Sequence, residues 1–151
     1  MISYKNMKKN GFGFRLKELM NDYNINVSSV AEKIGMKDDS IIYQWLNGSY
    51  LPSLKYANAI ANIFNCSLDY LFGFTDDFKN VKNQNLKNFS HQLETVIEDN
   101  KVSKYELINK AGICKSSLRG YFKEGKLPTM NSVIKLANYL NVSIDYLVGR
   151  D

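Results

Sequence analysis

Few side chains in this sequence could carry out catalysis or bind a metal ion. The 151 residues include two cysteines, Cys66 and Cys114, and a single histidine, His91. The cysteines lie far apart and match no spacing of metal ligands, and one imidazole gives little scope for acid–base chemistry. No nucleophile stands in a recognisable pattern with a base. We therefore expect no enzyme activity, no metal ion and no small-molecule cofactor.

Basic side chains are the other chemically active group, and they gather in the second half. The chain has 20 Lys and Arg against 15 Asp and Glu, a net charge of +5 with a pI of about 9.1. Residues 1–77 carry 8 side chains of each sign, whereas residues 78–151 carry 12 basic and 7 acidic ones. The whole excess lies in the second half and favours an anionic partner.

The composition is that of a globular protein without a membrane span. Apolar residues make up 44% of the chain and charged residues 23%, an ordinary globular balance. No apolar run approaches the roughly 18 residues that a membrane helix needs. Residues 1–10 contain lysines with no apolar stretch behind them, unlike a secretion signal. We expect a cytoplasmic protein, and the abundance of Asn, Lys, Ile and Tyr suggests an AT-rich bacterial genome.

Two segments of the sequence end alike, which indicates an internal repeat. Residues 65–73 read Asn-Cys-Ser-Leu-Asp-Tyr-Leu-Phe-Gly, and residues 141–149 read Asn-Val-Ser-Ile-Asp-Tyr-Leu-Val-Gly. Further upstream the spacing between matching residues grows by one, so one extra residue follows Gly35 in the first copy. The repeat predicts two domains, residues 12–77 and 88–151, joined by a polar linker over residues 78–87.

Each copy is expected to form five short helices and no strand. In the second copy, Ser103 and Glu106 form a capping box, Gly112 ends that helix, and the next helix follows over residues 115–122. Two short helices joined by a glycine turn cross steeply, so the second projects outward. The residues expected to face inward in the second copy are Leu93, Val96, Ile97, Leu107, Ile108, Ala111, Leu118, Tyr121, Phe122, Val133, Leu136, Ala137 and Leu140.

Each copy resembles the lambda-repressor-like helix-turn-helix domain, the Xre type of bacterial and phage regulators. The first copy matches its pattern with Val30-Ala31, Gly35, Trp45-Leu-Asn-Gly48, Pro52 and Ser-Leu-Asp-Tyr-Leu at 67–71. The second copy matches with Leu107-Ile108, Gly112, Pro128 and Ser-Ile-Asp-Tyr-Leu at 143–147. The resemblance covers all but the N-terminal tail and the linker. It implies an all-α fold of two tandem five-helix domains, each with a third helix that reads DNA.

The resemblance also implies which residues of the second copy contact DNA. In the family, the recognition helix faces base edges, and the N-terminus of the preceding helix meets phosphate. Lys and Arg can donate to guanine, and serine can serve either base. The residues so implied are Lys104, Lys115, Ser116, Ser117, Arg119, Lys123 and Lys126, with Lys104, Lys123 and Lys126 as phosphate contacts. The alternative is a solvated basic face with no ligand.

Two residues of this recognition helix have open roles. Gly120 stands where the family often has a long polar residue, so it allows close approach to the DNA backbone or has no role. Cys114 occupies the capping position beside Lys115, where a depressed pKa and a redox role are conceivable. We favour a small capping residue without further function. Cys66 is expected in the core and His91 on the surface.

The first copy is expected to bind DNA less well than the second. Asp38 and Asp39 open its recognition helix, where carboxylates suit a helix N-terminus but repel phosphate. Its candidate DNA contacts are Ser40, Tyr43 and Gln44, and Gln44 could pair with adenine. Whether this copy reads bases stays open.

Together these features predict a regulator of transcription, in the first place a repressor, that binds double-stranded DNA. The alternative is a protein-interaction module, such as an antirepressor or antitoxin, that uses the same fold without reading bases. We also expect the chain to form a homodimer, alone or on DNA. An exposed apolar segment, residues 70–74, would suit that packing.

Overall fold

The computed structural model describes residues 11–81 and 85–150, and these residues form ten helices and no strand. The predicted all-α class is therefore confirmed for the described part of the chain. The chain divides into two compact units, with the boundary between residues 84 and 85. No helix in either described range is long and apolar enough to cross a membrane. Residues 1–10, where a secretion signal is not expected, lie outside the described residues.

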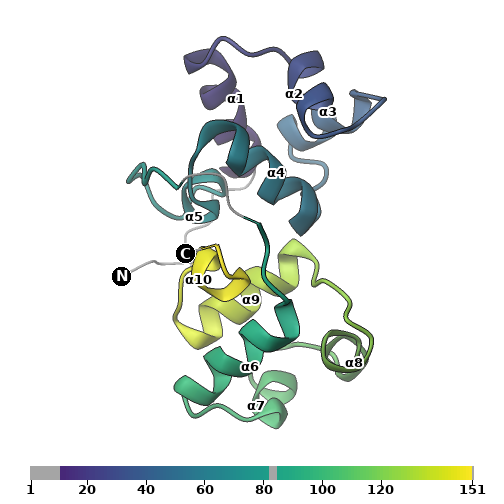
Figure 1. Ribbon diagram of the computed structural model, residues 1–151, viewed down its shortest axis with the longest axis vertical. Coiled ribbons are helices and arrows are strands. Elements are labelled where there is room, and N and C mark those ends of the chain that lie inside the picture. Colours follow the sequence, from purple (N-terminus) through teal and green to yellow (C-terminus); the bar gives the residue numbers. More distant parts are fainter. Residues whose placement is uncertain (1–10, 82–84, 151) are drawn as a thin grey trace. The chain divides into compact units, whose positions relative to one another are not determined.

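The first unit contains five helices, coloured purple to teal in Figure 1. They are α1 (Gly11–Asp22), α2 (Val27–Lys33), α3 (Ser40–Leu46), α4 (Leu54–Phe64) and α5 (Leu68–Leu71). The buried Trp45 of α3 joins them, because its ring lies 6.4 Å from that of Phe12 in α1 and 6.0 Å from that of Tyr56 in α4. Aromatic contacts at these distances pack α3 between its neighbours and leave its other face exposed.

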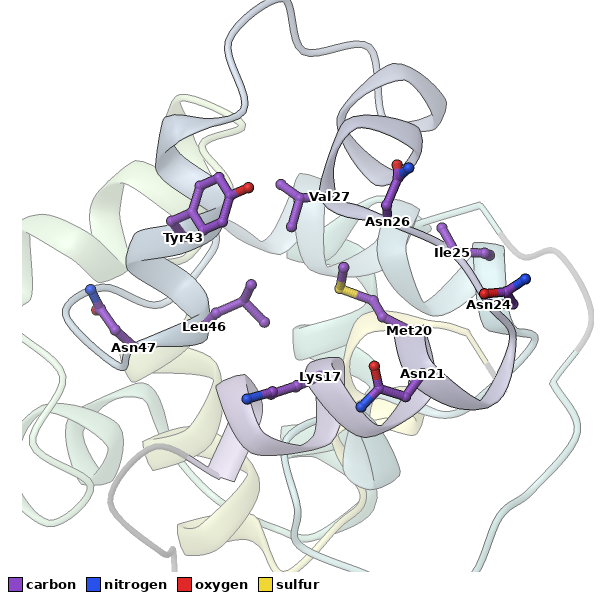
Figure 2. A pocket seen from close by; sticks show the side chains of 10 residues that line it. All are labelled: Lys17, Met20, Asn21, Asn24, Ile25, Asn26, Val27, Tyr43, Leu46 and Asn47. Carbon is purple, nitrogen blue, oxygen red and sulfur yellow. The ribbon is translucent and has the colours of Figure 1, made fainter.

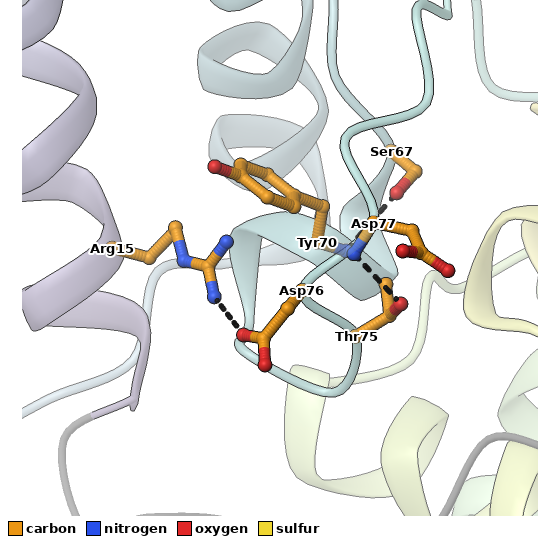
Figure 3. A network of polar contacts seen from close by, with 6 residues as sticks. All are labelled: Arg15, Ser67, Tyr70, Thr75, Asp76 and Asp77. Carbon is orange, nitrogen blue, oxygen red and sulfur yellow. Dashed lines mark hydrogen bonds and ion pairs between the residues drawn. The ribbon is translucent and has the colours of Figure 1, made fainter.

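The segment after α5 folds back onto α1. The guanidinium group of Arg15 lies 3.9 Å from the centroid of the Tyr70 ring and donates a hydrogen bond of 3.0 Å to Asp76 (Figure 3). The hydroxyl of Thr75 accepts a hydrogen bond from the backbone of Asp77, which closes the turn. A cation over a ring face and a charged hydrogen bond therefore fix the end of this unit to its first helix.

The start of the predicted linker is attached to the same unit. The Phe78 ring packs edge-on against Tyr70 at 5.2 Å, and the backbone N–H of Val81 donates to the carbonyl oxygen of Asn65 at 2.9 Å. Val81 is only 8% exposed. These contacts attach residues 78–81 of the predicted linker to the first unit. Residues 82–84 of the linker lie outside the described residues.

The expectation of an exposed apolar segment at residues 70–74 is wrong. Leu71 and Phe72 are buried, and Phe74 is 9% exposed. The Phe72 ring lies 4.8 Å from that of Phe12. A helix of one turn has no independent stability, and its apolar side chains here complete the core. This segment is therefore not the surface for a homodimer.

The second unit also contains five helices, coloured green to yellow in Figure 1. They are α6 (Phe89–Asp99), α7 (Lys104–Asn109), α8 (Lys115–Lys123), α9 (Met130–Leu140) and α10 (Ile144–Val148). The predicted capping box is present at α7, where Ser103 and Glu106 each accept a hydrogen bond from the other's backbone N–H. Glu106 also accepts a hydrogen bond of 2.9 Å from the hydroxyl of Tyr139, which connects α7 to α9.

A buried ion pair ends the second unit. Nε of Arg150 donates to a carboxylate oxygen of Asp145 at 3.0 Å, and both side chains are almost fully buried. Gly149 ends α10 with a φ of +80°, and a Cβ atom there would lie 2.7 Å from the Lys87 side chain. Only glycine fits both the backbone conformation and the space at this position.

The two units share the geometry of their helix ends. Gly35 after α2 and Gly112 after α7 have φ values of +79° and +78°. Asn65 after α4 and Asn141 after α9 are both left-handed, with φ values of 50° and 54°. Such residues end helices because they admit a positive φ. Equivalent helices therefore stop in the same way in both units.

Candidate nucleic-acid interface

Helix α8 is held by one face and presents the other to solvent. The N–H of Ile113, in the turn between α7 and α8, donates to the carbonyl of Leu107 in α7 at 3.1 Å. The side chains of Ile113, Leu107 and Leu118 are buried. Lys115 and Arg119 are exposed and lie beside Leu118, at the edge of the buried face. A short helix gains its stability from such packing, and its outer face remains available to a ligand.

Three cations form a row along the exposed face of α8. Lys115, Arg119 and Lys123 follow one another at intervals of four residues and are exposed. Residues four apart lie one above the other on a helix, about 6 Å apart along its axis. No acidic side chain in the described ranges forms an ion pair with any of the three. Their charges are therefore available to an anionic partner.

The other two predicted phosphate contacts already have partners within the chain. The ammonium group of Lys104 lies 4.0 Å from the centroid of the Phe122 ring and 4.0 Å from a carboxylate oxygen of Glu94. The ammonium group of Lys126 pairs with Glu124 at 2.8 Å, and this hydrogen bond raises the pKa of Lys126. These two lysines must release or share a partner before they contact phosphate.

A groove lies between α7 and α8, with a volume of about 530 Å³. Its apolar lining consists of Ile108, Leu118 and Phe122, and four cations complete it: Lys104, Lys115, Arg119 and Lys123. We call this site the cationic groove. Ile108 and Phe122, both expected to face inward, are half-buried here. The structure thus brings four of the predicted DNA contacts around an apolar floor that the sequence analysis had assigned to the core.

The predicted serine contacts Ser116 and Ser117 lie beside the thiol of Cys114. Their hydroxyl groups share hydrogen bonds with the sulfur atom, at 3.3 Å and 2.9 Å respectively. These two bonds lower the pKa of the Cys114 thiol from 9.0 to about 7. Cys114 stands at the capping position but makes no side-chain hydrogen bond to the helix backbone. The first turn of α8 therefore carries a thiol that is easily ionised.

Gly120 leaves room for a side chain of the protein itself. A Cβ atom at this position would lie 3.2 Å from Cδ of Lys126, and the N–H of Lys126 donates to the Gly120 carbonyl at 3.0 Å. Gly120 is buried as a result. The aliphatic part of Lys126 occupies the space beside Gly120. The structure therefore does not support a role for Gly120 in close approach to the DNA backbone.

Helix α3 of the first unit, for which we expect a DNA-reading role, begins at Ser40, after the two aspartates. The carboxylate of Asp38 accepts a hydrogen bond of 2.9 Å from the backbone of Ser40. That bond lowers the pKa of Asp38. Asp39 stands at the capping position without a side-chain hydrogen bond to the helix. Two carboxylates therefore precede the exposed Ser40, and Asp38 stays ionised at neutral pH.

Tyr43 lies at a groove of about 820 Å³ between α1, α2 and α3 (Figure 2). Its side chain is 56% exposed and projects toward Val27 across the groove. Gln44 is half-buried, and its backbone carbonyl accepts a hydrogen bond from Ser49. Of the three predicted contacts in this unit, Ser40 and Tyr43 are thus more accessible than Gln44.

Sequence reasoning did not assign Ile108 and Phe122 to the cationic groove. Both match the helical spacing of core residues, so the pattern favoured burial. The sequence did contain one indication of exposure. Ile108 lies four residues after Lys104, and Phe122 lies three residues after Arg119 on the same helix. An apolar side chain beside charged ones is often at the edge of a core.

Comparison with known proteins relates this architecture to one family. A family model described as helix-turn-helix matches residues 16–71, which run from α1 through α5. An HTH-type transcriptional regulator of Archaeoglobus fulgidus is 33% identical over 63 residues, which is 42% of this chain and 89% of the relative. A regulator of Bacillus subtilis is 34% identical over 61 residues, 40% of this chain and 54% of that protein. No solved structure gives a significant match.

The matched segment contains both short helices and the glycine turn of the first unit. Residues 16–71 include α2 and α3, and the turn between them passes through Gly35. A second relative from Archaeoglobus fulgidus, also an HTH-type transcriptional regulator, is 32% identical over 63 residues that make up 87% of its length. The chain therefore belongs to the helix-turn-helix family of transcriptional regulators.

Proposed function

We propose that this chain is a sequence-specific regulator that binds double-stranded DNA and represses transcription. The observation that carries this proposal is the row of Lys115, Arg119 and Lys123 along the exposed face of α8. An α-helix fits the major groove of DNA, and Lys and Arg donate to guanine there. Family membership supports the same function. Occupying a promoter needs no further activity, which is why we propose repression.

We propose further that the second unit is a second helix-turn-helix domain. On this proposal the domains are residues 12–77 and 88–151, joined by residues 78–87. The order of five helices and the matching left-handed positions after α2 and α7 support it. The family model matches the first unit alone, so this part of the proposal depends on the internal repeat and on the shared helix ends.

Each candidate residue has a role in this proposal. Lys115 and Arg119 read bases, with Ser116 and Ser117 beside them, and Lys123 contacts phosphate. Lys104 and Lys126 reach phosphate after releasing Glu94 and Glu124. In the first unit, Ser40, Tyr43 and Gln44 make weaker contacts, because Asp38 and Asp39 repel the same backbone.

The test is selection of a binding site from random duplexes with the full chain, followed by binding measurements on the selected site. We expect an enriched sequence and an affinity that falls steeply between about 50 and 200 mM salt. Lys115→Ala should weaken binding, whereas the control Lys135→Ala, at an exposed lysine of α9, should not. Failure to enrich any sequence, with the fold intact, would favour the protein-interaction alternative.

A further inference from the structure

We propose that the cationic groove also binds an acidic amphipathic helix of a regulatory protein, and that this helix competes with DNA. The competition depends on the proposed function, since the groove shares Lys115 and Arg119 with the DNA-reading face. The binding itself depends only on the groove. The partner is defined by its chemistry: one apolar face, with acidic side chains along its edges.

The floor of the groove is the first argument. Ile108 of α7 and Phe122 of α8 are half-buried, and with the buried Leu118 they supply the apolar lining of the groove, with the ammonium group of Lys104 over the Phe122 ring. A concave site of about 530 Å³ lies within the usual range of ligand pockets, which combine an apolar lining with a few polar groups. Covering this floor would remove apolar surface from water and so stabilise a complex.

The charge around the floor is the second argument. Four cations line the groove and none of its lining residues is acidic. Three of them stand at intervals of four residues on α8, with a rise of about 6 Å between successive positions. An α-helical partner presents acidic side chains at the same interval when they lie four residues apart. Charge and spacing therefore match an acidic helix laid along α8.

DNA satisfies only part of this site. In the proposed complex, base edges accept hydrogen bonds from Lys115 and Arg119, and a phosphate contacts Lys123. These contacts give Ile108 and Phe122 no apolar partner. An amphipathic helix meets both requirements, because its apolar side chains enter the groove while its carboxylates pair with the cations. Such a helix gains affinity from a contribution that salt does not screen, whereas DNA binding is governed by counterion release.

The experiment uses the full chain and a fluorescent synthetic peptide. The peptide is an 18-residue helix with leucines at i, i+3, i+4 and i+7, flanked by glutamates. The control peptide keeps every glutamate and replaces each leucine by serine. We expect the leucine peptide to bind at least about tenfold more tightly, a difference of about 1.4 kcal/mol. Equal affinity of the two peptides would overturn the proposal, since charge alone would then explain binding.

Variants separate the groove from the DNA-reading face. Ile108→Ser should weaken binding of the leucine peptide about tenfold, whereas Ile108→Val should not. In both variants, the affinity for the selected DNA site should change less than about twofold. Lys115→Ala should weaken binding of both the leucine peptide and the selected DNA site. If Ile108→Ser disturbs the fold, chemical-shift changes on the unaltered chain decide the matter, and perturbations away from Ile108 and Phe122 would place the peptide elsewhere.

Competition is measured by adding the leucine peptide to the chain bound to its selected site. Displacement of DNA is the expected result. Peptide binding without displacement would refute the shared surface. A chain that binds the peptide but selects no DNA site would disprove the proposed function and leave the groove as a protein-binding site.

Discussion

The charges of Lys115 and Arg119 are more available to a ligand than that of Lys126. The first two are exposed and have no acidic partner in the described part of the chain, whereas Lys126 pairs with Glu124 at 2.8 Å. Lys115→Ala and Arg119→Ala should each weaken specific DNA binding by roughly 1–3 kcal/mol and relax the base preference. Lys126→Ala should have a smaller effect. Titrations of each variant against the selected site and against single-base changes of it check this.

The thiol of Cys114 should react in a strongly pH-dependent way. Hydrogen bonds with Ser116 and Ser117 lower its pKa to about 7, so the reactive thiolate forms as pH rises through that value. The alkylation rate should therefore increase with a midpoint near 7, below that of an ordinary thiol. The buried Cys66 is the internal control and should stay unmodified in the folded chain.

A double substitution of Ser116 and Ser117 by alanine should move this midpoint upward. Mass spectrometry after brief alkylation at a series of pH values gives the rate at each cysteine separately. An unchanged midpoint in the double variant would show that the helix N-terminus, and not the two hydroxyls, stabilises the thiolate.

Local pairs were predictable from the sequence and distant ones were not. The capping box of Ser103 and Glu106 follows from spacing within one turn, and the structure contains it. The predicted places of Cys66 in the core and His91 on the surface are also confirmed. Arg15 pairs with Asp76, and Tyr139 with Glu106, across 61 and 33 residues of sequence, which spacing alone does not define.

At the scale of elements, Gly120→Ala should stabilise α8. Alanine is favoured over glycine inside a helix by about 1 kcal/mol. The added Cβ would meet Cδ of Lys126 at 3.2 Å, but this is part of a flexible, exposed side chain that can move aside. We expect a higher unfolding temperature for the full chain. A lower unfolding temperature would mean that the contact between Lys126 and the helix stabilises the protein by more than the helix propensity of alanine does.

The buried pair of Asp145 and Arg150 should be important for the second unit. Asp145→Ala leaves a buried guanidinium without this carboxylate, and breaking such a pair costs roughly 3–5 kcal/mol. The control is Asp76→Ala, which removes the fully exposed partner of Arg15 and should have a much smaller effect, because exposed ion pairs contribute little to stability. Unfolding in urea, followed by circular dichroism, measures both.

The position of the single tryptophan makes this test specific to one unit. Trp45 lies in the core of the first unit, so its fluorescence follows the unfolding of that unit. Asp145→Ala should shift part of the circular dichroism transition and leave the fluorescence transition unchanged. A simultaneous shift of both signals would show that the two units unfold together.

The apolar pattern predicted the helices better than it predicted their exposed edges. All five helices expected in the second half are present, yet Ile108 and Phe122 lie half-buried at the cationic groove. A short helix has a broad apolar stripe, and periodicity does not tell which edge of the stripe a neighbour covers. Residues 70–74 show the opposite error, because the fold buries apolar residues that had been assigned to the surface.

For the whole molecule, the two units should contribute unequally to DNA binding. Residues 1–77 have no net charge, and residues 78–151 carry the full +5. A triple variant with the proposed phosphate contacts Lys104, Lys123 and Lys126 changed to alanine should lower the slope of log affinity against log salt by about 2.7. A matched variant of the first unit, Tyr43→Ala with Gln44→Ala, should leave the slope nearly unchanged. Stronger loss from the second variant would assign base reading to the first unit, the one that the family model matches.

The anchoring of Val81 on Asn65 and the place of Lys87 against Gly149 leave six peptide units between fixed points of the two units. Such a chain spans at most about 22 Å. If both units bind DNA, a unit that dissociates stays tethered near its site while the other remains bound. Its effective concentration is then of millimolar order, and two weak contacts act as one strong one. Loss of the weaker unit should therefore shorten the residence time on DNA far more than it slows association.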